Sequence, residues 1–338
     1  MNDREIGFAV IGCGLMGSRH VEILRATPGA RVVCVQDRDR AAAEKAAGGA
    51  DVADLYQEVL TRDDVDAVVI CLPSAQHAGA GLMAARAGKH VVMEKPIAIT
   101  TVDAHRVAVE CERNGVLCAV ICQNRFSDAM QSLKLALDRG DLGTPILARA
   151  SVKWFRHDPY YTSSDWRGRL EGEGGGVLMN QAVHSLDQLL WFFGTPTEVK
   201  GMTHRSRGVL ETEDIGLALL RFEGGMVATL EASTSTFPGF EERVEVHGTA
   251  GSAIVERGRM VHWSHQADRP QPAPPPFPPA TPGLSDKYQL FQRQYLNILD
   301  AIHGRAELVV PPAEAVAVVE TTLAIYDEER RSRDGLLP

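Results

Sequence analysis

One short stretch near the start of the chain restricts the fold more than any other. Ile6-Gly-Phe-Ala-Val-Ile-Gly12 is a nearly continuous apolar run, as is typical of a strand buried on both faces. It leads directly into Gly12-Cys-Gly-Leu-Met-Gly17, and a helical pattern follows over residues 18–26. Because this G-x-G-x-x-G motif stands after a strand and before a helix, it predicts a dinucleotide-binding turn.

The residue types in this motif suit a bound pyrophosphate. Gly12, Gly14 and Gly17 permit a tight turn and a close approach, and the helix N-terminus stabilises negative charge. A second apolar strand over residues 31–36 ends in Asp37, at the spacing where a carboxylate accepts hydrogen bonds from the adenosine ribose. Asp37 favours NAD because it would repel a 2′-phosphate. Arg38 would pair with that phosphate, so NADP stays an alternative.

The alternation of strands and helices continues through the first third of the chain. Strands are expected over residues 66–73, 89–94 and 116–122, with helices over residues 76–87 and 100–114 between them. Repeated βα units of this length predict an α/β fold with a doubly wound parallel sheet, whose ligand lies at the carboxyl ends of the strands. Pro73 and Lys95 follow such ends, so we expect Lys95 to point into the crevice.

The pattern changes after residue 122. A helix over residues 126–139 is followed by several strands without intervening helices, which predicts a mostly antiparallel sheet with one open face. The expected strands are residues 143–154, 197–205, 213–222, 226–234, 241–247 and 253–256. We therefore predict two domains, a dinucleotide-binding Rossmann domain over residues 1–122 and an α+β substrate-binding and oligomerisation domain over residues 123–338.

Two features of the second domain bear on its assembly and surface. Alternating apolar residues on the open face predict a homodimer or homotetramer formed through that face; they are Leu217, Leu219, Val227 and Thr229. Residues 269–283 are dense in proline, which predicts an extended surface segment, either a spacer or a lid or inter-subunit arm. Two amphipathic helices are expected within residues 284–331.

A glycine-rich loop at residues 172–176 opens a helix predicted over residues 177–193. Asn180 and His184 stand four residues apart, so a regular helix would project both from one face. A polar pair on a helix that leaves a glycine loop is a plausible place to handle a proton.

Composition excludes several classes of protein. The net charge of −9 and the lack of a basic cluster argue against a nucleic-acid partner, and no apolar run is long enough to span a membrane. The start of the chain carries no export signal, and all six cysteines fall in the first 122 residues, within or beside apolar runs. We therefore expect a cytoplasmic protein with free buried cysteines. No ligand spacing for a metal site appears.

Together, five segments resemble the Gfo/Idh/MocA family of NAD(P)-dependent sugar and inositol oxidoreductases over almost the whole chain. They are Gly12-Cys-Gly-Leu-Met-Gly17, Leu72-Pro-Ser-Ala-Gln-His77, Gly88-Lys-His-Val-Val-Met-Glu-Lys-Pro96, Gln123-Asn-Arg-Phe126 and Gly174-Gly-Gly-Val-Leu-Met-Asn-Gln-Ala-Val-His184. The Glu-Lys-Pro element is the most specific of them.

The resemblance implies roles for individual residues. Lys95 would hold the substrate hydroxyl near the nicotinamide, and His184 would act as the general base. Well-known members have an aspartate four residues before that histidine, where this chain has Asn180. The chain is similar to a sub-branch with asparagine at this place, whose members act on glycosides, inositols or sugar acids.

We therefore predict an oxidoreductase that transfers a hydride between a secondary hydroxyl of a sugar, inositol, sugar acid or glycoside and NAD(P). Lys95 donates to the hydroxyl oxygen, His184 removes its proton, and Asn180 hydrogen-bonds a neighbouring hydroxyl. Two alternatives stay open. One is redox-neutral glycoside cleavage or epimerisation through a transient 3-keto intermediate with bound NAD. The other is a non-catalytic NAD(P)-binding regulator, which the asparagine would suit.

The predicted catalytic residues are Lys95, His184 and Asn180. The predicted cofactor contacts are Gly12, Gly14, Leu15, Met16, Gly17, Asp37, Arg38, Cys71, Leu72, Pro73, His77, Glu94, Lys95, Trp166 and Arg167. The predicted substrate contacts are Lys95, Arg125, Trp154, Tyr160, Tyr161, Asn180 and His184.

Overall fold

The computed structural model describes residues 4–333, which belong to two compact units. Of these residues, 4–123 and Phe277–Val316 form the first unit, and Asn124–Pro276 and 317–333 form the second. The chain thus leaves the first unit one residue after the expected boundary. It returns to that unit at residue 277, whereas the sequence analysis expected residues 277–316 in the second domain.

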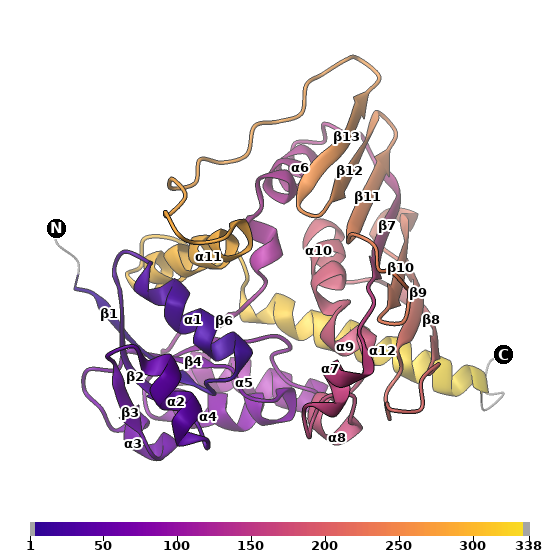
Figure 1. Cartoon of the computed structure of the whole chain (residues 1–338). Helices are drawn as coiled ribbons and strands as arrows, with labels where there is room; N and C mark the ends of the chain where they lie inside the picture. Colours follow the sequence, from indigo (N-terminus) through magenta and orange to yellow (C-terminus); the bar gives the residue numbers. More distant parts are fainter. Residues whose placement is uncertain (1–3, 334–338) are drawn as a thin grey trace. The chain divides into compact units, whose positions relative to one another are not determined.

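The first unit contains six parallel strands in the order β3-β2-β1-β4-β5-β6 (Figure 1). This is the strand order of a Rossmann fold, and its reversal point lies between β1 and β4. The strands are β1 (Ile6–Ile11), β2 (Ala30–Gln36), β3 (Asp51–Ala53), β4 (Ala67–Ile70), β5 (His90–Met93) and β6 (Cys118–Val120). The helices are α1 (Leu15–Arg25), α2 (Arg40–Ala47), α3 (Tyr56–Leu60), α4 (His77–Arg86), α5 (Thr101–Arg113) and α11 (Asp286–Ile302).

Helix α11 explains why residues 277–316 belong to the first unit. Its apolar residues recur at three- and four-residue steps and are buried along one face; they are Phe291, Tyr295, Ile298 and Leu299. They join the core that contains Phe8 of β1 and Ile23 of α1. Each such side chain contributes roughly 1.5–3 kcal/mol when buried, so the first unit depends on this late segment of the chain.

The second unit is built on a seven-stranded sheet in the order β13-β12-β11-β7-β10-β9-β8. Only β7 and β10 pair in parallel, as expected for a mostly antiparallel sheet. The strands are β7 (Pro145–Lys153), β8 (Glu198–His204), β9 (Ile215–Arg221), β10 (Val227–Ser233), β11 (Arg243–Gly248), β12 (Gly251–Glu256) and β13 (Arg259–His265). The helices are α6 (Asp128–Asp138), α7 (Asp158–Thr162), α8 (Leu170–Glu173), α9 (Val177–Asn180) and α10 (Val183–Phe193). Helix α12 (Pro312–Arg333) begins in the first unit and continues into the second.

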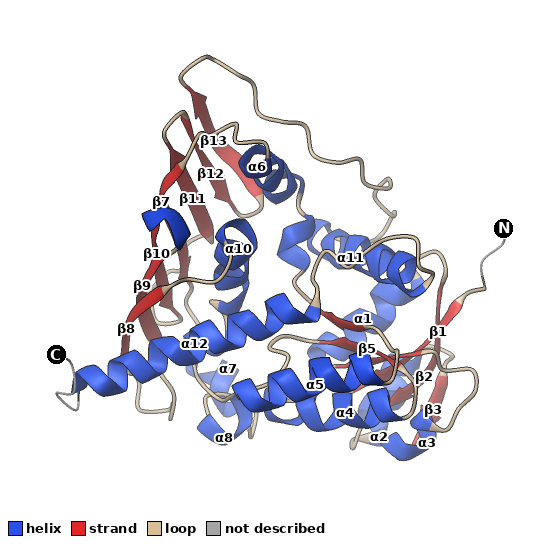
Figure 2. Ribbon diagram, turned by 180° about the vertical axis from the view of Figure 1, so that it is seen from behind, coloured by secondary structure: helices blue, strands red, loops and turns tan. Residues whose placement is uncertain are grey.

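The two faces of this sheet differ. Figures 1 and 2 show α6 and α10 against one face, where Leu186 and Leu189 of α10 share a core with Ala148 and Ala150 of β7. On the opposite face Leu217, Leu219 and Val227 are exposed and Thr229 is half-buried. The open face predicted from the alternation is therefore present.

The helix predicted over residues 177–193 is interrupted. Val177 O accepts hydrogen bonds from the N–H groups of both Gln181 (3.0 Å) and Ala182 (2.8 Å), and the second bond spans five residues. Such a wide turn inserts one residue into the helical register, so α9 ends at Asn180 and α10 begins at Val183. Asn180 therefore ends α9 and His184 lies in the first turn of α10, so the single regular helix that was predicted is divided into two.

Several elements have no counterpart in the sequence analysis, namely β3, β13, α2, α3, α7 and α8. The most substantial is β13, whose residues are exposed or only half-buried along its whole length. It therefore lacks the apolar alternation that identifies a strand. The proline-rich residues 269–280 form neither helix nor strand, in agreement with the expected extended segment.

Candidate functional site

The glycine motif between β1 and α1 forms a cradle without side chains. Gly12 adopts φ +87°, and a Cβ atom there would lie 2.7 Å from Cys71 O. A Cβ atom on Gly17 would lie 1.7 Å from Gly12 O, so the helix and strand approach too closely for any other residue. A Cβ atom on Gly14 would meet nothing within 4 Å. Gly14 thus borders open space at the N-terminus of α1, and this arrangement fits a pyrophosphate.

The first residues of α1 continue this cradle. Leu15 is exposed, whereas Met16 is half-buried and packs against the core of the unit. No side chain caps the N-terminus of α1 in the described part of the chain, so the N–H groups of its first turn remain available to an anion.

Asp37 at the end of β2 is held in place by two backbone donors. Its Oδ2 accepts from Cys13 N–H (2.6 Å) and its Oδ1 accepts from Asp39 N–H (2.8 Å). A carboxylate accepts about four hydrogen bonds, so each oxygen keeps capacity for a ribose hydroxyl. Arg38 is exposed beside it. Both residues stand where the sequence analysis expected the ribose to bind.

His77 connects the loops that follow β4 and β5. Its ring is buried, with Nε2 2.8 Å from Leu72 O and Nδ1 2.7 Å from Pro96 O. Burial lowers the pKa of His77 below its ordinary value and favours the neutral ring. The neutral ring has a single N–H, so it donates to one of these two carbonyls, and both lie within hydrogen-bond distance of the ring. His77 was predicted to contact the cofactor, and in the structure it supports the loops that carry Pro73 and Lys95. Cys71, Leu72 and Pro73 are half-buried.

Behind Lys95 lies a buried polar chain that sequence reasoning missed. Glu94 Oε2 accepts from Lys95 N–H (3.2 Å), and Glu94 Oε1 lies 2.9 Å from His20 Nε2. His20 Nδ1 lies 2.7 Å from the hydroxyl of Tyr295 on α11. Burial raises the pKa of Tyr295 well above its ordinary value, so its hydroxyl stays protonated and donates to Nδ1. His20 then donates from Nε2 to Glu94.

In the second unit, Asn180 is oriented by a carboxylate. Its Nδ2 donates to Oε1 of Glu173, while Oε2 of Glu173 accepts from Gly168 N–H at 2.5 Å. Glu173 is only 2% exposed and was not identified from the sequence, where it appears as one acid within a glycine run. Since an amide held through its nitrogen presents its oxygen as the acceptor, Asn180 is suited to orient a hydroxyl.

The glycine run itself is needed for packing. A Cβ atom on Gly172 would lie 2.6 Å from Trp166 O, one on Gly175 would lie 2.3 Å from the Tyr326 hydroxyl, and one on Gly176 would lie 1.8 Å from Glu213 O. These close contacts are made with the chain's own atoms. Packing within the chain therefore accounts for glycine at these three positions.

Arg125 anchors the helix that carries His184. Its guanidinium donates to Asp187 of α10 from Nε (2.9 Å) and from Nη2 (2.5 Å), and its side chain is fully buried. Its Cζ also lies 5.2 Å from the centre of the Trp191 ring. Arg125 was predicted to contact the substrate. In the structure its guanidinium pairs with the buried carboxylate of Asp187. His184 lies half-buried in the first turn of α10.

Five side chains from the segment between β7 and α8 alternate between aromatic rings and guanidinium groups, and we call them the aromatic–arginine stack. The Arg156 Cζ lies 4.8 Å from the Trp154 ring centre and 5.5 Å from that of Tyr160. The Arg167 Cζ lies 4.8 Å from the Tyr160 ring centre and 5.0 Å from that of Trp166. Four predicted ligand contacts therefore meet in one cluster, namely Trp154, Tyr160, Trp166 and Arg167.

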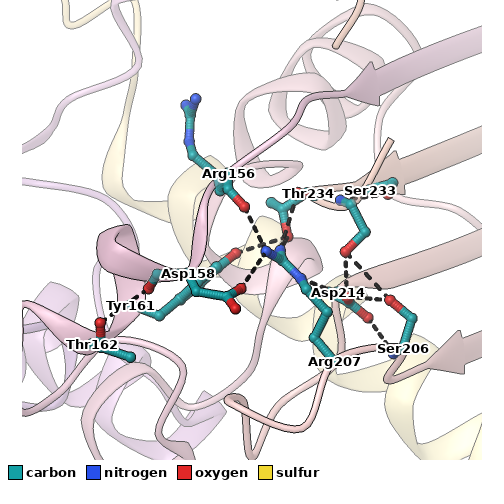
Figure 3. A network of polar contacts seen from close by, with 10 residues as sticks. Arg156, Asp158, Tyr161, Thr162, Ser206, Arg207, Asp214, Ser233 and Thr234 are labelled. Carbon is teal, nitrogen blue, oxygen red and sulfur yellow. Dashed lines mark hydrogen bonds and ion pairs between the residues drawn. The ribbon is translucent and has the colours of Figure 1, made fainter. Parts of the chain in front are cut away.

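A polar network fixes the base of this segment (Figure 3). Arg207 Nη2 donates to Thr234 O (3.1 Å), and Tyr161, which is buried, donates to the Thr234 hydroxyl at 2.7 Å. Arg207 Nε reaches Asp214 at 3.3 Å. Tyr161 was predicted to contact the substrate, but its hydroxyl is used within this network. Its role is to hold the segment that presents Tyr160.

Residues 4–333 contain neither a metal-binding cluster nor a membrane-spanning helix. No group of three or more His, Cys, Asp or Glu side chains in this range is arranged to hold a metal ion. No helix in the same range combines the length and apolarity needed to cross a bilayer. The six cysteines are all unpaired with one another, and five of them are buried.

Both units match known protein families. Residues 6–122 match the model of an oxidoreductase family with an NAD-binding Rossmann fold, and residues 130–254 match the GFO/IDH/MocA C-terminal domain. The chain is 28% identical over 270 residues to scyllo-inositol 2-dehydrogenase (NAD(+)) of Bacillus subtilis, covering 77% of this chain and 76% of that protein. It is 31% identical over 276 residues to inositol 2-dehydrogenase of Rubrobacter xylanophilus, covering 76% and 75%.

Among solved structures, the chain is similar to the WlbA dehydrogenase of Bordetella pertussis in complex with NADH and UDP-GlcNAcA. The TM-score is 0.88 at 29% identity, and the alignment covers 100% of this chain and 99% of that one. The glycine cradle and Asp37 agree with an NAD-dependent oxidoreductase that acts on CH–OH groups. The chain belongs to the Gfo/Idh/MocA family of oxidoreductases.

Proposed function

We propose that this protein oxidises a secondary hydroxyl of a sugar, inositol or sugar acid, with Lys95 and His184 as its catalytic residues. The observation that supports this most directly is the glycine cradle in the same parallel sheet as the strand end that carries Lys95. The backbone N–H of Lys95 donates a hydrogen bond to the carboxylate of the buried Glu94. The relatives named above include inositol dehydrogenases and a dehydrogenase crystallised with a sugar acid linked to a nucleotide.

The chemistry divides between the cofactor and the chain. NAD, which the glycine cradle and Asp37 would hold, would supply the hydride acceptor for the carbinol carbon. Lys95 donates a hydrogen bond to the hydroxyl oxygen and stabilises the negative charge that develops there, while His184 removes the hydroxyl proton. Asn180, oriented by Glu173, accepts from a neighbouring hydroxyl and fixes the sugar ring.

The finer assignments follow the same reasoning. Asp37 favours NAD over NADP because its carboxylate repels a 2′-phosphate. Arg167 and Trp166 would contact the cofactor, since a guanidinium suits a pyrophosphate. Six cysteines without disulfides suit the reducing cytoplasm. The exposed apolar residues of β9 and β10 suit a homodimer or homotetramer formed through the open sheet face.

The test measures turnover with a panel of sugars and polyols, and the absorbance of the reduced nicotinamide reports the reaction. Lys95→Ala should lower kcat at least a hundredfold while the dissociation constant of NADH stays within about twofold. Wild-type activity in the Lys95→Ala variant would remove the assigned role. Sugar conversion without accumulation of NADH would indicate the redox-neutral reaction instead. Binding of NADH without conversion of any sugar would indicate a regulator.

A further inference from the structure

Arg156 and Arg167 differ from the arginines around them. Within residues 4–333 neither forms an ion pair, and their guanidinium groups lie over aromatic rings. The neighbouring arginines Arg169, Arg207, Arg243 and Arg257 all pair with carboxylates. The Nε of Arg156 is also buried with no hydrogen-bond partner in the same range. A buried donor without a partner is costly unless a ligand satisfies it.

The acids near Arg156 are already committed to other partners. Asp158 lies 3.3 Å from Arg207, and the backbone carbonyl of Arg156 also accepts from Arg207. Figure 3 shows the Arg156 guanidinium directed away from the Arg207–Asp214 network, so it does not share these contacts. Asp158 therefore does not form an ion pair with Arg156.

Arg156 also lines an open cavity of about 480 Å³ in the second unit, which is within the range of small-molecule sites. The wall is formed by Trp154, Phe155, Arg156, Pro238, Gly239, Phe240, Glu241 and Glu256. Its two glutamates pair with Arg257 (3.1 Å) and Arg243 (3.7 Å), respectively. Arg156 is thus the cation of this wall that stands without a carboxylate, next to the flat ring of Trp154.

We propose that Arg156 binds an anionic group of the substrate, a carboxylate or a phosphate, while the Trp154 ring lies against the sugar. A guanidinium held over an aromatic ring keeps its N–H edge for a bidentate contact with such a group. The proposal rests on the proposed function and narrows it to acidic or phosphorylated sugars. Arg156 precedes Tyr160 in the sequence and Arg167 follows it. Arg167 remains assigned to the cofactor, so the two arginines bind two different anions.

The experiment measures equilibrium binding and turnover separately. The NADH complex is titrated with D-glucuronate, D-glucose 1-phosphate and UDP-D-glucuronate, and with D-glucose and myo-inositol as neutral probes. At least one anionic probe should bind tenfold or more tightly than the neutral ones. Arg156→Gln should abolish that preference and leave neutral binding within twofold, while Arg156→Lys should recover part of it. Arg169→Gln, a nearby arginine paired with Glu211, should leave the preference intact.

The different probes distinguish a carboxylate from a phosphate. They also test the anion site separately from the proposed dehydrogenase function. Preference for glucuronate over glucose 1-phosphate indicates a carboxylate, and the reverse indicates a phosphate. Equal binding of anionic and neutral probes, or equal loss of both in Arg156→Gln, would overturn the inference. Arg156-dependent anion binding without reduction of NAD by any probe would support the inference and count against the dehydrogenase assignment. NADH affinity in the Arg156 variants should stay unchanged, which checks that they are folded.

Discussion

Asn180 occupies a position where a carboxylate would have supplied charge, and Glu173 restores a carboxylate one hydrogen bond away. Because Glu173 is buried and also accepts from Gly168 N–H, its position is fixed from two sides. An amide orients a hydroxyl but transfers no proton, so the negative charge next to Asn180 comes from Glu173. We regard Glu173 as a positioning residue that acts through Asn180.

Glu173→Gln tests this role. The change keeps the size of the side chain but removes the charge that holds the Asn180 amide, so kcat should fall on the order of tenfold to a hundredfold. Steady-state turnover measures the effect, and the KM for NAD should change little. Glu171→Gln, an exposed acid of the same helix α8, should keep wild-type turnover. Equal effects in both variants would show that only the overall charge matters.

The chain from Tyr295 through His20 to Glu94 leads to a second prediction. Tyr295→Phe removes the donor to His20 Nδ1 and leaves that nitrogen buried without a partner, which costs roughly 1–3 kcal/mol. Amides of β5 should exchange faster with solvent, as measured by hydrogen exchange and mass spectrometry. Tyr288→Phe, on the same helix, is the control because the described structure gives its hydroxyl no hydrogen bond. Unchanged exchange in Tyr295→Phe would refute the role of this chain in holding the strand end.

At the level of elements, the network around Asp214 ties the loop after β8 to the end of β10. Burial alone would raise the pKa of the Asp214 carboxyl, but hydrogen bonds from Ser206, Ser235 and Arg207 outweigh it and bring the pKa below its usual value. A depressed carboxyl pKa stabilises the folded state above the unfolded pKa of about 4, and this contribution is lost as pH falls through the folded value.

Asp214→Asn should therefore lower the free energy of unfolding at pH 7 by roughly 2–4 kcal/mol, and its deficit should shrink as pH falls below about 4. Urea unfolding followed by tryptophan fluorescence reports this directly, since the four tryptophans (Trp154, Trp166, Trp191 and Trp263) all belong to the second unit. Asp158→Asn removes an exposed partner of the same Arg207 and should cost less than about 1 kcal/mol. A deficit that grows in acid would contradict the assignment.

The elements also show what a sequence can predict. The buried parallel strands were found because a strand enclosed on both faces reads as a continuous apolar run, as in β4. The break between α9 and α10 was not found, because Asn180-Gln-Ala-Val183 contains neither glycine nor proline. The glycine turn at Gly12 and the acid Asp37 after the second strand were predicted because their sequence motifs are local. Glu173 and the pair of His20 with Tyr295 were missed because their meaning depends on contacts that only the fold creates.

At the level of the whole molecule, the open sheet face carries the proposed oligomer interface. Met202 lies opposite Leu217 on adjacent strands, and Leu219 is 60% exposed. Leu219→Asp would place a charge in the proposed interface, where an unpaired buried charge costs several kcal/mol, so the oligomer should dissociate. Sedimentation velocity measures the change. Val109→Asp, at an exposed apolar position on α5, should leave the assembly intact. A monomeric wild-type protein would refute the proposed interface.

The chain completes its first unit late. A ribosome has already made all of β1 to β6 and then the entire seven-stranded sheet before it reaches α11, whose Phe291 and Tyr295 close the core around Phe8. Until α11 is synthesised, the apolar residues of the nucleotide-binding unit that pack against this helix stay exposed, and the core of the unit is incomplete. Translation that stops near residue 276 would therefore yield a polypeptide with an unfinished core, however well its sheets had already paired.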